Sequence, residues 1–192
     1  LEAIEQVEQE SLLEQGMQPQ RKLHLDVIGV TILASLVLTI LEFYGSSSDW
    51  NWLAKTAGLL DEQYAKLIRG FFRDKTYGRL HRLGYWSLST FVGYMLVPML
   101  WVKFVMGRSL REMGLSGNGV FRHAWVYVLL YLVVLPAVYL VSSTPSFQAT
   151  YPFYRHADRS LYDFLVWELF YAIQFMSLEF FFRGFLVHGL KR

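Results

Sequence analysis

The chain contains four long apolar stretches, each separated from the next by a more polar segment. Each has close to the roughly 20 residues with which a helix rising about 1.5 Å per residue crosses about 30 Å of hydrocarbon. The stretch WVYVLLYLVVLPAVYLV, broken by Pro136, has no polar face at a period of 3.6 residues, unlike the surface helix of a soluble protein. The pattern predicts membrane spans at 27–44, 83–102, 124–143 and 162–186.

The segments between these stretches predict helices outside the hydrocarbon. Residues 50–82 place apolar side chains at helical spacing beside lysines and arginines, which predicts an interfacial amphipathic helix with its bases facing headgroups. A solvated connecting helix would have the same pattern. Residues 107–119 form a second basic segment, which ends in turn residues. We expect residues 1–20 to form an acidic helix outside the bilayer, followed by one membrane domain over 21–192.

Composition agrees with this prediction of an all-α, polytopic integral membrane helical bundle. Hydrophobic residues make up 54% of the chain and charged residues only 18%, against about 25% charged in a typical soluble domain. The absence of cysteine excludes disulfides and thiolate metal sites. We therefore expect a multi-pass protein of a plasma or inner membrane whose partners are the lipid bilayer and not nucleic acid.

Charge does not decide which side of the membrane each loop faces. Residues 1–20 hold five acids and no base, and all 18 bases follow. The flanks at 21–22 and 103–111 are basic, yet the connection 55–82, on the opposite side in a four-span topology, carries seven lysines or arginines. The positive-inside rule therefore gives conflicting answers, and a re-entrant segment at 50–60 would be one way to reconcile them.

The fourth apolar stretch retains three ionisable residues, Glu168, Glu179 and Arg183. An ionisable side chain near the bilayer centre costs about 2.5–3.5 kcal/mol, so membrane helices keep one mainly where it is paired or used. Glu179 and Arg183 are four residues apart, the spacing at which a helical ion pair forms. Glu168 lies three turns before Glu179, so both carboxylates could face one interior seam. A solvated ion pair with no chemical role has the same spacing.

Residues 178–184, LEFFFRG, resemble the first motif of the CAAX protease and bacteriocin-processing family, the Abi or type II CAAX prenyl protease-like intramembrane endopeptidases. That motif is E-E-x-x-x-R, commonly continued as F-R-G, and the segment RSLREMGLS is similar to a linker of the same family. The resemblance implies a helical membrane bundle in which a glutamate, with a later histidine, activates water to cleave a peptide bond. It implies Glu179 and Arg183 as catalytic-site residues, no cofactor, and a peptide or protein substrate, prenylated or not. A metal in the full-length parent stays open.

Two departures from the family pattern limit what the resemblance implies. Leu178 stands where the family has its first glutamate. None of the five histidines has Phe four residues before it or Asn or Asp four residues after it. His24, His81, His156 and His188 are expected to be interfacial, and His123 starts a span beside Arg122. We expect the chain to be the N-terminal part of a longer protease and silent by itself. The alternatives are an immunity or scaffolding protein with a Glu179–Arg183 clasp, and a transporter fragment with Glu168 and Glu179 along a polar path.

Overall fold

The computed structural model describes residues 25–115, 120–151 and 153–191, and the expected helix at 1–20 lies outside them. The described residues form helices and no strands. Four helices are long and apolar enough to cross a membrane, and they confirm the four expected stretches: Leu25–Tyr44, Gly78–Phe104, Ala124–Ser142 and Leu161–Gly189. By length and composition the chain is therefore compatible with a multi-pass membrane protein.

Two of the four long helices contain a π-helical turn, which the sequence pattern did not reveal. Gly78–Phe104 consists of α4 (Gly78–Thr90), the π-helix η1 (Phe91–Leu96) and α5 (Val97–Phe104). Pro98 lies two residues after the end of η1, and a proline both lacks an N–H donor and clashes with the carbonyl four residues earlier. In the widened turn the Val97 N–H donates to the Val92 carbonyl, five residues back. The π-helix thus lets the long helix continue into Pro98.

The fourth long helix is divided in the same way. It consists of α8 (Leu161–Glu179), the π-helix η2 (Phe180–Leu186) and the short α9 (Val187–Gly189). The motif expected to carry chemistry therefore lies on a π-helical turn and not on a regular α-helix. Such turns occur often at functional sites, because they displace the side chains that follow from the regular helical positions.

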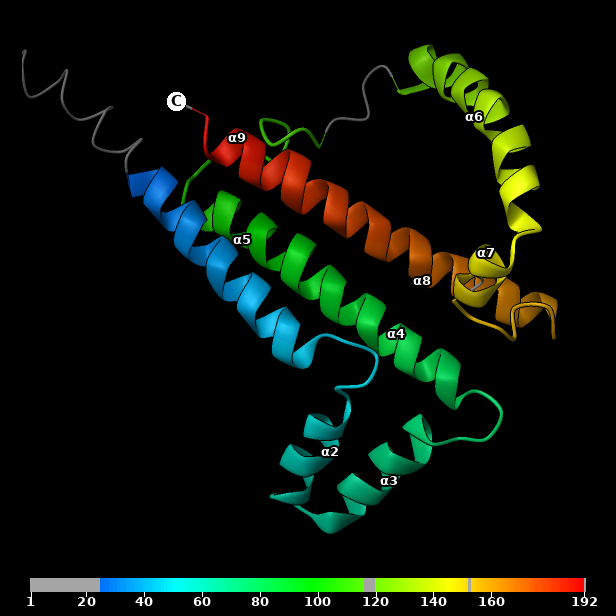
Figure 1. Cartoon of the computed structure of the whole chain (residues 1–192). Helices are drawn as coiled ribbons and strands as arrows, with labels where there is room; N and C mark the ends of the chain where they lie inside the picture. Colours follow the sequence, from blue (N-terminus) through cyan, green and yellow to red (C-terminus); the bar gives the residue numbers. More distant parts are fainter. Residues whose placement is uncertain (1–24, 116–119, 152, 192) are drawn as a thin grey trace, which may run out of the picture.

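Three of the long helices pack side by side into a bundle (Figure 1). Glycines allow close approach at the crossings: a Cβ at Gly29 would lie 2.9 Å from the Trp101 ring, and one at Gly93 would lie 2.7 Å from Leu41. A Cβ at Gly84 would lie 2.9 Å from the Phe170 ring. Small residues at such crossings are the usual means of close packing between membrane helices. The contacts make Leu25–Tyr44 antiparallel to α4–α5, and α4–α5 parallel to α8–α9.

The apolar core of the bundle lies near the end where the chain reaches Gly189. We call this the Gly189 end, and the opposite end, where α4 and α8 begin, the Gly78 end. The buried core residues come from the Leu25–Tyr44 helix, α5, the loop after it, and η2: Val30, Ala34, Val37, Val102, Met106, Met113, Phe180, Phe181 and Phe185. The ion pair between Asp26 and Arg108, with Oδ2 and Nη2 2.7 Å apart, links the first helix to that loop. The Gly189 end is thus the best-packed part of the bundle.

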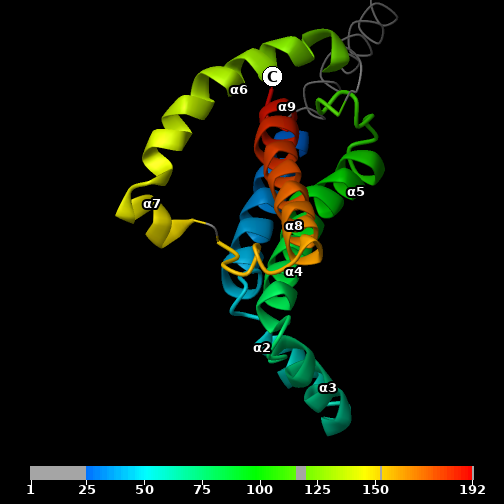
Figure 2. The ribbon, with the colours of Figure 1, turned by 90° about the vertical axis from the view of Figure 1, so that its right-hand side faces the viewer.

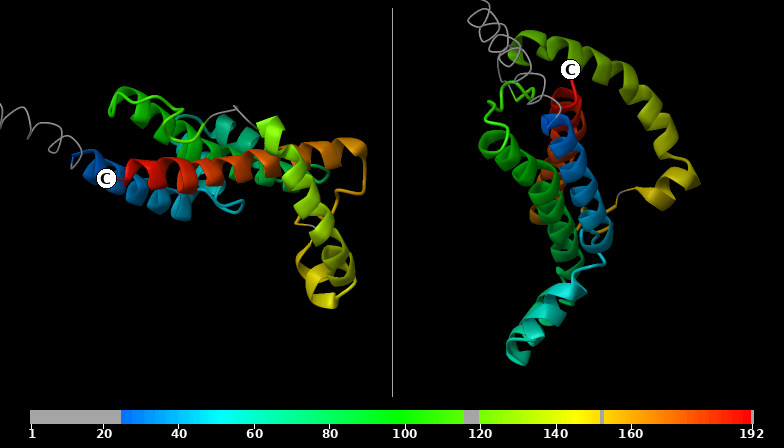
Figure 3. Two further views of the ribbon diagram at one scale, coloured as in Figure 1. Left: turned by 90° about the horizontal axis from the view of Figure 1, so that it is seen from above. Right: turned by 90° about the vertical axis from the view of Figure 1, so that its left-hand side faces the viewer.

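The third long helix stands apart from this bundle. α6 (Val120–Ser142) bows away from the packed helices in Figure 2, and both views in Figure 3 agree. None of the residues in Ala124–Ser142 is buried among the described residues. Pro136 lies inside α6, and the helix continues through it as one long helix, in agreement with the expected stretch 124–143. Short α7 (Pro145–Thr150) follows and leads back toward the start of α8.

The segment 50–82 does not form the single amphipathic helix expected from its pattern. It forms a hairpin of α2 (Asn51–Gly58) and α3 (Glu62–Phe72), and its last residues begin α4. The first helix ends at Gly58, and Asp61 caps the second, because its carboxylate accepts the Gln63 N–H at 2.8 Å. Trp50 stacks on Phe72 with ring centroids 4.9 Å apart and closes the hairpin. Tyr64, Leu67 and Phe71 form an exposed apolar stripe on α3, so its amphipathic character is retained.

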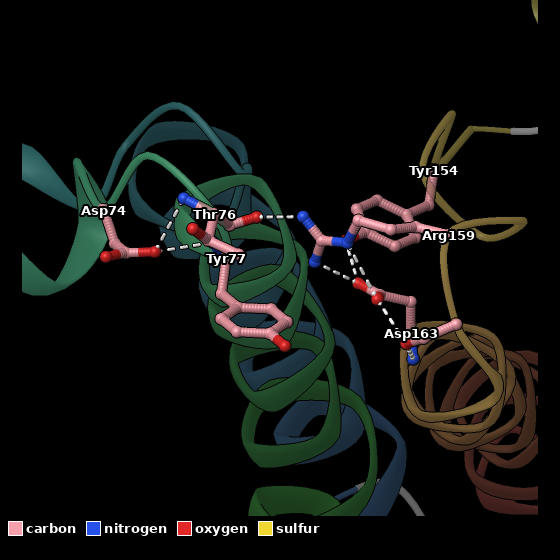
Figure 4. A network of polar contacts seen from close by, with 7 residues as sticks. Asp74, Thr76, Tyr77, Tyr154, Arg159 and Asp163 are labelled. Carbon is pink, nitrogen blue, oxygen red and sulfur yellow. Dashed lines mark hydrogen bonds and ion pairs between the residues drawn. The ribbon is translucent and has the colours of Figure 1, made fainter.

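A polar network ties the two helix starts together at the Gly78 end (Figure 4). Asp163 is fully buried on the first turn of α8. Its carboxylate accepts hydrogen bonds from Arg159 Nη2 at 2.6 Å and Arg159 Nε at 3.0 Å. Arg159 also donates to the Thr76 carbonyl at 2.8 Å, just before α4. The Tyr154 hydroxyl donates to Asp163 at 2.5 Å, and the Ser160 hydroxyl at 2.6 Å. The network therefore fixes α8 against α4.

A second carboxylate, that of Asp74, stabilises the turn just before α4. Asp74 accepts the backbone N–H groups of Tyr77 at 2.6 Å and Thr76 at 2.9 Å. These two hydrogen bonds hold the pKa of Asp74 below its usual range, because they stabilise the charged carboxylate. Arg159 also lies over the Tyr77 ring, 4.6 Å from its centroid. The turn at 74–77 is thus held both by the Asp74 carboxylate and by Arg159 of the loop before α8.

Titration of Tyr154 is expected to destabilise the folded protein above about pH 10. Burial, with the hydrogen bond to Asp163, raises the pKa of Tyr154 to about 12, whereas an exposed tyrosine titrates near 10. Between these values the unfolded chain has lost the phenolic proton and the folded protein keeps it, so the free energy of unfolding falls as pH rises. Thermal unfolding of the wild type and of Tyr154→Phe from about pH 9 to about pH 12 tests this. The wild type should lose more stability than Tyr154→Phe; parallel curves would contradict it.

Candidate functional site

The expected pair of Glu179 and Arg183 forms at the junction of α8 and η2. Arg183 Nη1 lies 2.9 Å from Glu179 Oε2, with the partners four residues apart. The Glu179 side chain is 39% exposed and the Arg183 side chain 81% exposed. The carboxylate is thus half covered by the bundle, while the guanidinium projects from it. The described residues alone do not enclose the pair.

The pair lies on the wall of a cavity of about 440 Å³ near the Gly189 end. The cavity is bounded by η1, by the end of α8, by η2 and α9, and by the loop at 113–115. Its lining is largely apolar and contains several methionines: Met95, Met113, Gly114, Leu115, Phe175, Met176, Glu179, Phe180, Arg183, Gly184 and His188. Glu179 and Arg183 are the charged side chains among these described residues. A carboxylate in such surroundings has few competing polar partners, so Arg183 can determine its orientation.

Two segments far apart in the sequence meet at this wall. Gly184, directly after Arg183, lies so close to the 113–115 loop that a Cβ there would be 2.7 Å from the Met113 carbonyl oxygen. Gly114 has a positive φ of 83°, a conformation that glycine adopts without steric cost, and this turn leaves the Met113 carbonyl facing η2. The M-G-L residues of the basic linker and the E-x-x-x-R-G turn therefore build one wall.

Replacing Gly184 with alanine is expected to lower the free energy of unfolding by about 1–3 kcal/mol, because the new methyl group meets backbone that cannot rotate away. Gly70→Ala is the matched control, since a Cβ there has nothing within 4 Å on the exposed side of α3. That control should be stabilising by up to about 1 kcal/mol, because alanine favours helix over glycine. Thermal unfolding of the purified protein in detergent measures both, and equal shifts in the two variants would contradict the close approach.

His188 belongs to the same cavity, although its sequence position suggested only an interfacial side chain. Its Nδ1 lies 3.0 Å from the Gly184 carbonyl and 3.1 Å from the Arg183 carbonyl. Both partners accept hydrogen bonds only, so Nδ1 carries the proton and donates. In the neutral ring, Nε2 is then an acceptor on the cavity wall. The spacing of four residues from Gly184 could have indicated this histidine, because it places both residues on one side of the helix.

Glu168 and Leu178 do not join Glu179. Glu168 is exposed on α8 and does not line the cavity, so the expectation that both carboxylates face one seam is wrong. The three turns between them bring Glu168 close to the middle of α8, away from η2. Leu178 lines a different cavity, of about 640 Å³, together with Glu42, Tyr94 and Gln174. The first motif position therefore faces another side of the helix from Glu179.

Among the described residues, no three His, Asp or Glu side chains gather closely enough to hold a metal ion. The chemical groups of the site are thus a carboxylate, a guanidinium and an imidazole on one helix, facing a loop.

No protein-family model matches this chain, and neither a curated protein nor a solved structure matches it significantly.

Proposed function

We propose that this chain is part of an intramembrane endopeptidase similar to the CAAX protease and bacteriocin-processing family. The observation that carries the proposal is the shared wall on which the E-x-x-x-R-G turn meets the M-G-L residues of the linker. Both segments resemble family motifs in sequence, and nothing in their sequence separation requires them to touch. Their contact at one cavity supports reading them as parts of a single site.

The chemistry of amide hydrolysis suits these groups. Attack by water on a peptide carbonyl requires a base to accept a proton and preorganised donors for the developing oxyanion. Glu179 supplies the carboxylate, and Arg183 orients it through the 2.9 Å contact. With Leu178 at the first motif position, Glu179 is the motif carboxylate that this chain offers as the base. The apolar lining limits the water that reaches the site.

The family mechanism also uses two histidine motifs, F-x-x-x-H and H-x-x-x-N/D. Neither motif occurs in the 192 residues. The proposal therefore requires that the protein supply them elsewhere. α6 is compatible with that requirement, because its apolar side chains over Ala124–Ser142 are uncovered and can pack against lipid or further helices. A 440 Å³ cavity open to such helices can be closed by them.

The two rival functions differ in what they require of the pair. A structural clasp in an immunity or scaffolding protein gains little from a pair whose arginine is 81% exposed, since exposed ion pairs contribute about 0–1 kcal/mol. A transporter path needs Glu168 and Glu179 on one wall, and Glu168 does not line the cavity. The clasp is therefore the stronger of the two rivals.

The test is peptide cleavage by the protein that the whole gene encodes. If the proposal is right, that protein carries both histidine motifs on further apolar stretches, and it cleaves a membrane-embedded reporter peptide in proteoliposomes. Cleavage should depend on Glu179. A full-length protein with neither histidine motif, which folds but cleaves no reporter, would favour the clasp.

A further inference from the structure

A third cavity, with different chemistry, lies at the Gly78 end of the bundle, opposite the end that holds Glu179. It has a volume of about 480 Å³ and lies between the first two turns of α4, the loop after Leu25–Tyr44, and the loop before α8. The residues that line it are Ser46, Ser47, Arg79, Arg82, Leu83, Trp86 and Phe153. Two arginines and two serines thus face it, and no carboxylate of the described residues does.

Each arginine is held in place by a hydrogen bond to a backbone carbonyl and has further N–H donors for a ligand. Arg79 Nη2 donates to the Phe153 carbonyl at 2.9 Å, and Arg82 Nη1 donates to the Phe72 carbonyl at 2.9 Å. A guanidinium has five N–H donors, so each arginine retains several for a ligand. Neither forms an ion pair with a described residue. Being three residues apart on a helix, they are neighbours of like charge, which is unfavourable without an anion between them.

The nearest carboxylate in the adjoining loop is already engaged. Asp49 Oδ2 accepts the Ser46 N–H at 2.9 Å, and its Oδ1 accepts the Ser48 hydroxyl at 3.3 Å. These bonds keep Asp49 within its own turn, and it does not line the cavity. Glu42 lines the adjoining 640 Å³ cavity, which shares Ser46 and Trp86 with this one, but it forms no ion pair with either arginine. No described carboxylate therefore neutralises Arg79 and Arg82, and their charge is left for an external anion.

The position of the cavity along the helix indicates which class of anion it binds. Gly78–Phe104 has 27 residues, a length of about 40 Å at 1.5 Å per residue. The hydrocarbon of a bilayer is about 30 Å thick, and the headgroup layers bring it to about 40–45 Å. The first turn of this helix therefore reaches the headgroups. Trp86 lines the same cavity, and tryptophan prefers the level between headgroups and acyl chains.

We propose that this cavity binds the phosphate group of an anionic phospholipid. Arg79 and Arg82 bind the phosphate oxygens through their free N–H groups, since a guanidinium matches phosphate oxygens in pairs. The Ser47 hydroxyl is within the same cavity and can donate to the headgroup. Leu83 and Trp86 lie on the following turn of α4 and contact the upper part of the acyl chains. The site is independent of the protease proposal, because it shares no residue with the Glu179 cavity.

The experiment measures binding of short-chain, water-soluble phospholipids to the full-length protein in uncharged detergent. Phosphatidylglycerol is the anionic probe, phosphatidylcholine the zwitterionic one, and inorganic phosphate the headgroup-free one. We expect phosphatidylglycerol to bind the wild type at least about tenfold more tightly than either of the others. In Arg79→Gln/Arg82→Gln this preference should disappear, and in Lys66→Gln/Lys75→Gln it should stay within about twofold. The control pair makes the same change in charge on exposed lysines outside the cavity.

Three results would overturn the proposal. Equal affinity of the wild type for phosphatidylglycerol and phosphatidylcholine would show that no anion site exists. Equal losses in the arginine and lysine variants would show diffuse attraction instead of a site, and inorganic phosphate binding as tightly as phosphatidylglycerol would make it a site for the free ion. If the glutamine pair does not fold, Arg79→Lys/Arg82→Lys replaces it. That pair retains the charge but not the paired donors, so an unchanged lipid preference would contradict the assigned contacts.

Discussion

Glu179→Gln in the full-length protein is expected to lower the rate of peptide cleavage at least about 100-fold. Glutamine keeps the size of the side chain and can still accept a hydrogen bond from Arg183, so the pair's geometry is retained. It loses the negative charge and the ability to take a proton from water. The measurement is the initial rate on a reporter peptide in proteoliposomes, with substrate well above and well below the KM. The loss should appear mainly in kcat, because a base acts in the transition state.

Glu168→Gln is the matched control for this experiment. It makes the same chemical change on the same helix, but Glu168 is exposed and outside the cavity. We expect its cleavage rate to stay within about twofold of the wild type. Cleavage that survives in Glu179→Gln, with both variants equally folded by thermal unfolding, would remove Glu179 from the mechanism. A fall in folded protein without a fall in the rate per folded molecule would identify the pair as a structural clasp.

Asp163→Asn is expected to lower the free energy of unfolding by about 3 kcal/mol or more. Asp163 is fully buried and is the common acceptor for Arg159, Ser160 and Tyr154. Asparagine presents one acceptor oxygen and an NH₂ group that would face these donors, so Arg159 loses its charged partner. Since Arg159 also holds the Thr76 carbonyl, the contact between the starts of α8 and α4 should weaken as well. Thermal unfolding in detergent measures the effect.

Glu62→Gln is the control for Asp163→Asn. It removes the charge from another carboxylate paired with an arginine, with Arg69 Nη1 and Glu62 Oε1 2.8 Å apart, but the two side chains are 40% and 58% exposed. Water screens such a pair, so the expected loss is below about 1 kcal/mol. If the two variants were equally stable, the buried network would not be what holds α8 on α4.

The four long helices could be predicted because their signal is local. A span needs only enough apolar residues in one stretch, and the expected ranges agree with the structure to within a few residues. The pair of Glu179 and Arg183 was predictable for the same reason, since four residues on a helix bring two side chains together. The hairpin of α2 and α3 was not foreseen, although Asp61 carries a capping signal that could have divided the predicted helix.

The π-helical turns were beyond the reach of the hydrophobic pattern. A π-turn displaces the side chains that follow it, but in a stretch that is apolar on every side no polar face records that displacement. Pro98 gives a local reason for η1, but η2 has no proline, and its conformation accompanies the packing of Phe181 and Phe185 in the core. Pro136, by contrast, lies inside α6 without a π-turn, so a proline by itself does not predict one.

The sequence alone determined the number of long apolar helices, their order and the one ion pair within the fourth, since each depends on residues within a few turns of one another. The tertiary structure alone decided that Gly184 meets Met113, that His188 lines the Glu179 cavity while Glu168 does not, and that Arg79 and Arg82 face a cavity beside Ser47. These contacts depend on which helix faces lie together. Helix packing sets those faces through side chains tens of residues apart, and hydropathy along one chain does not record that choice.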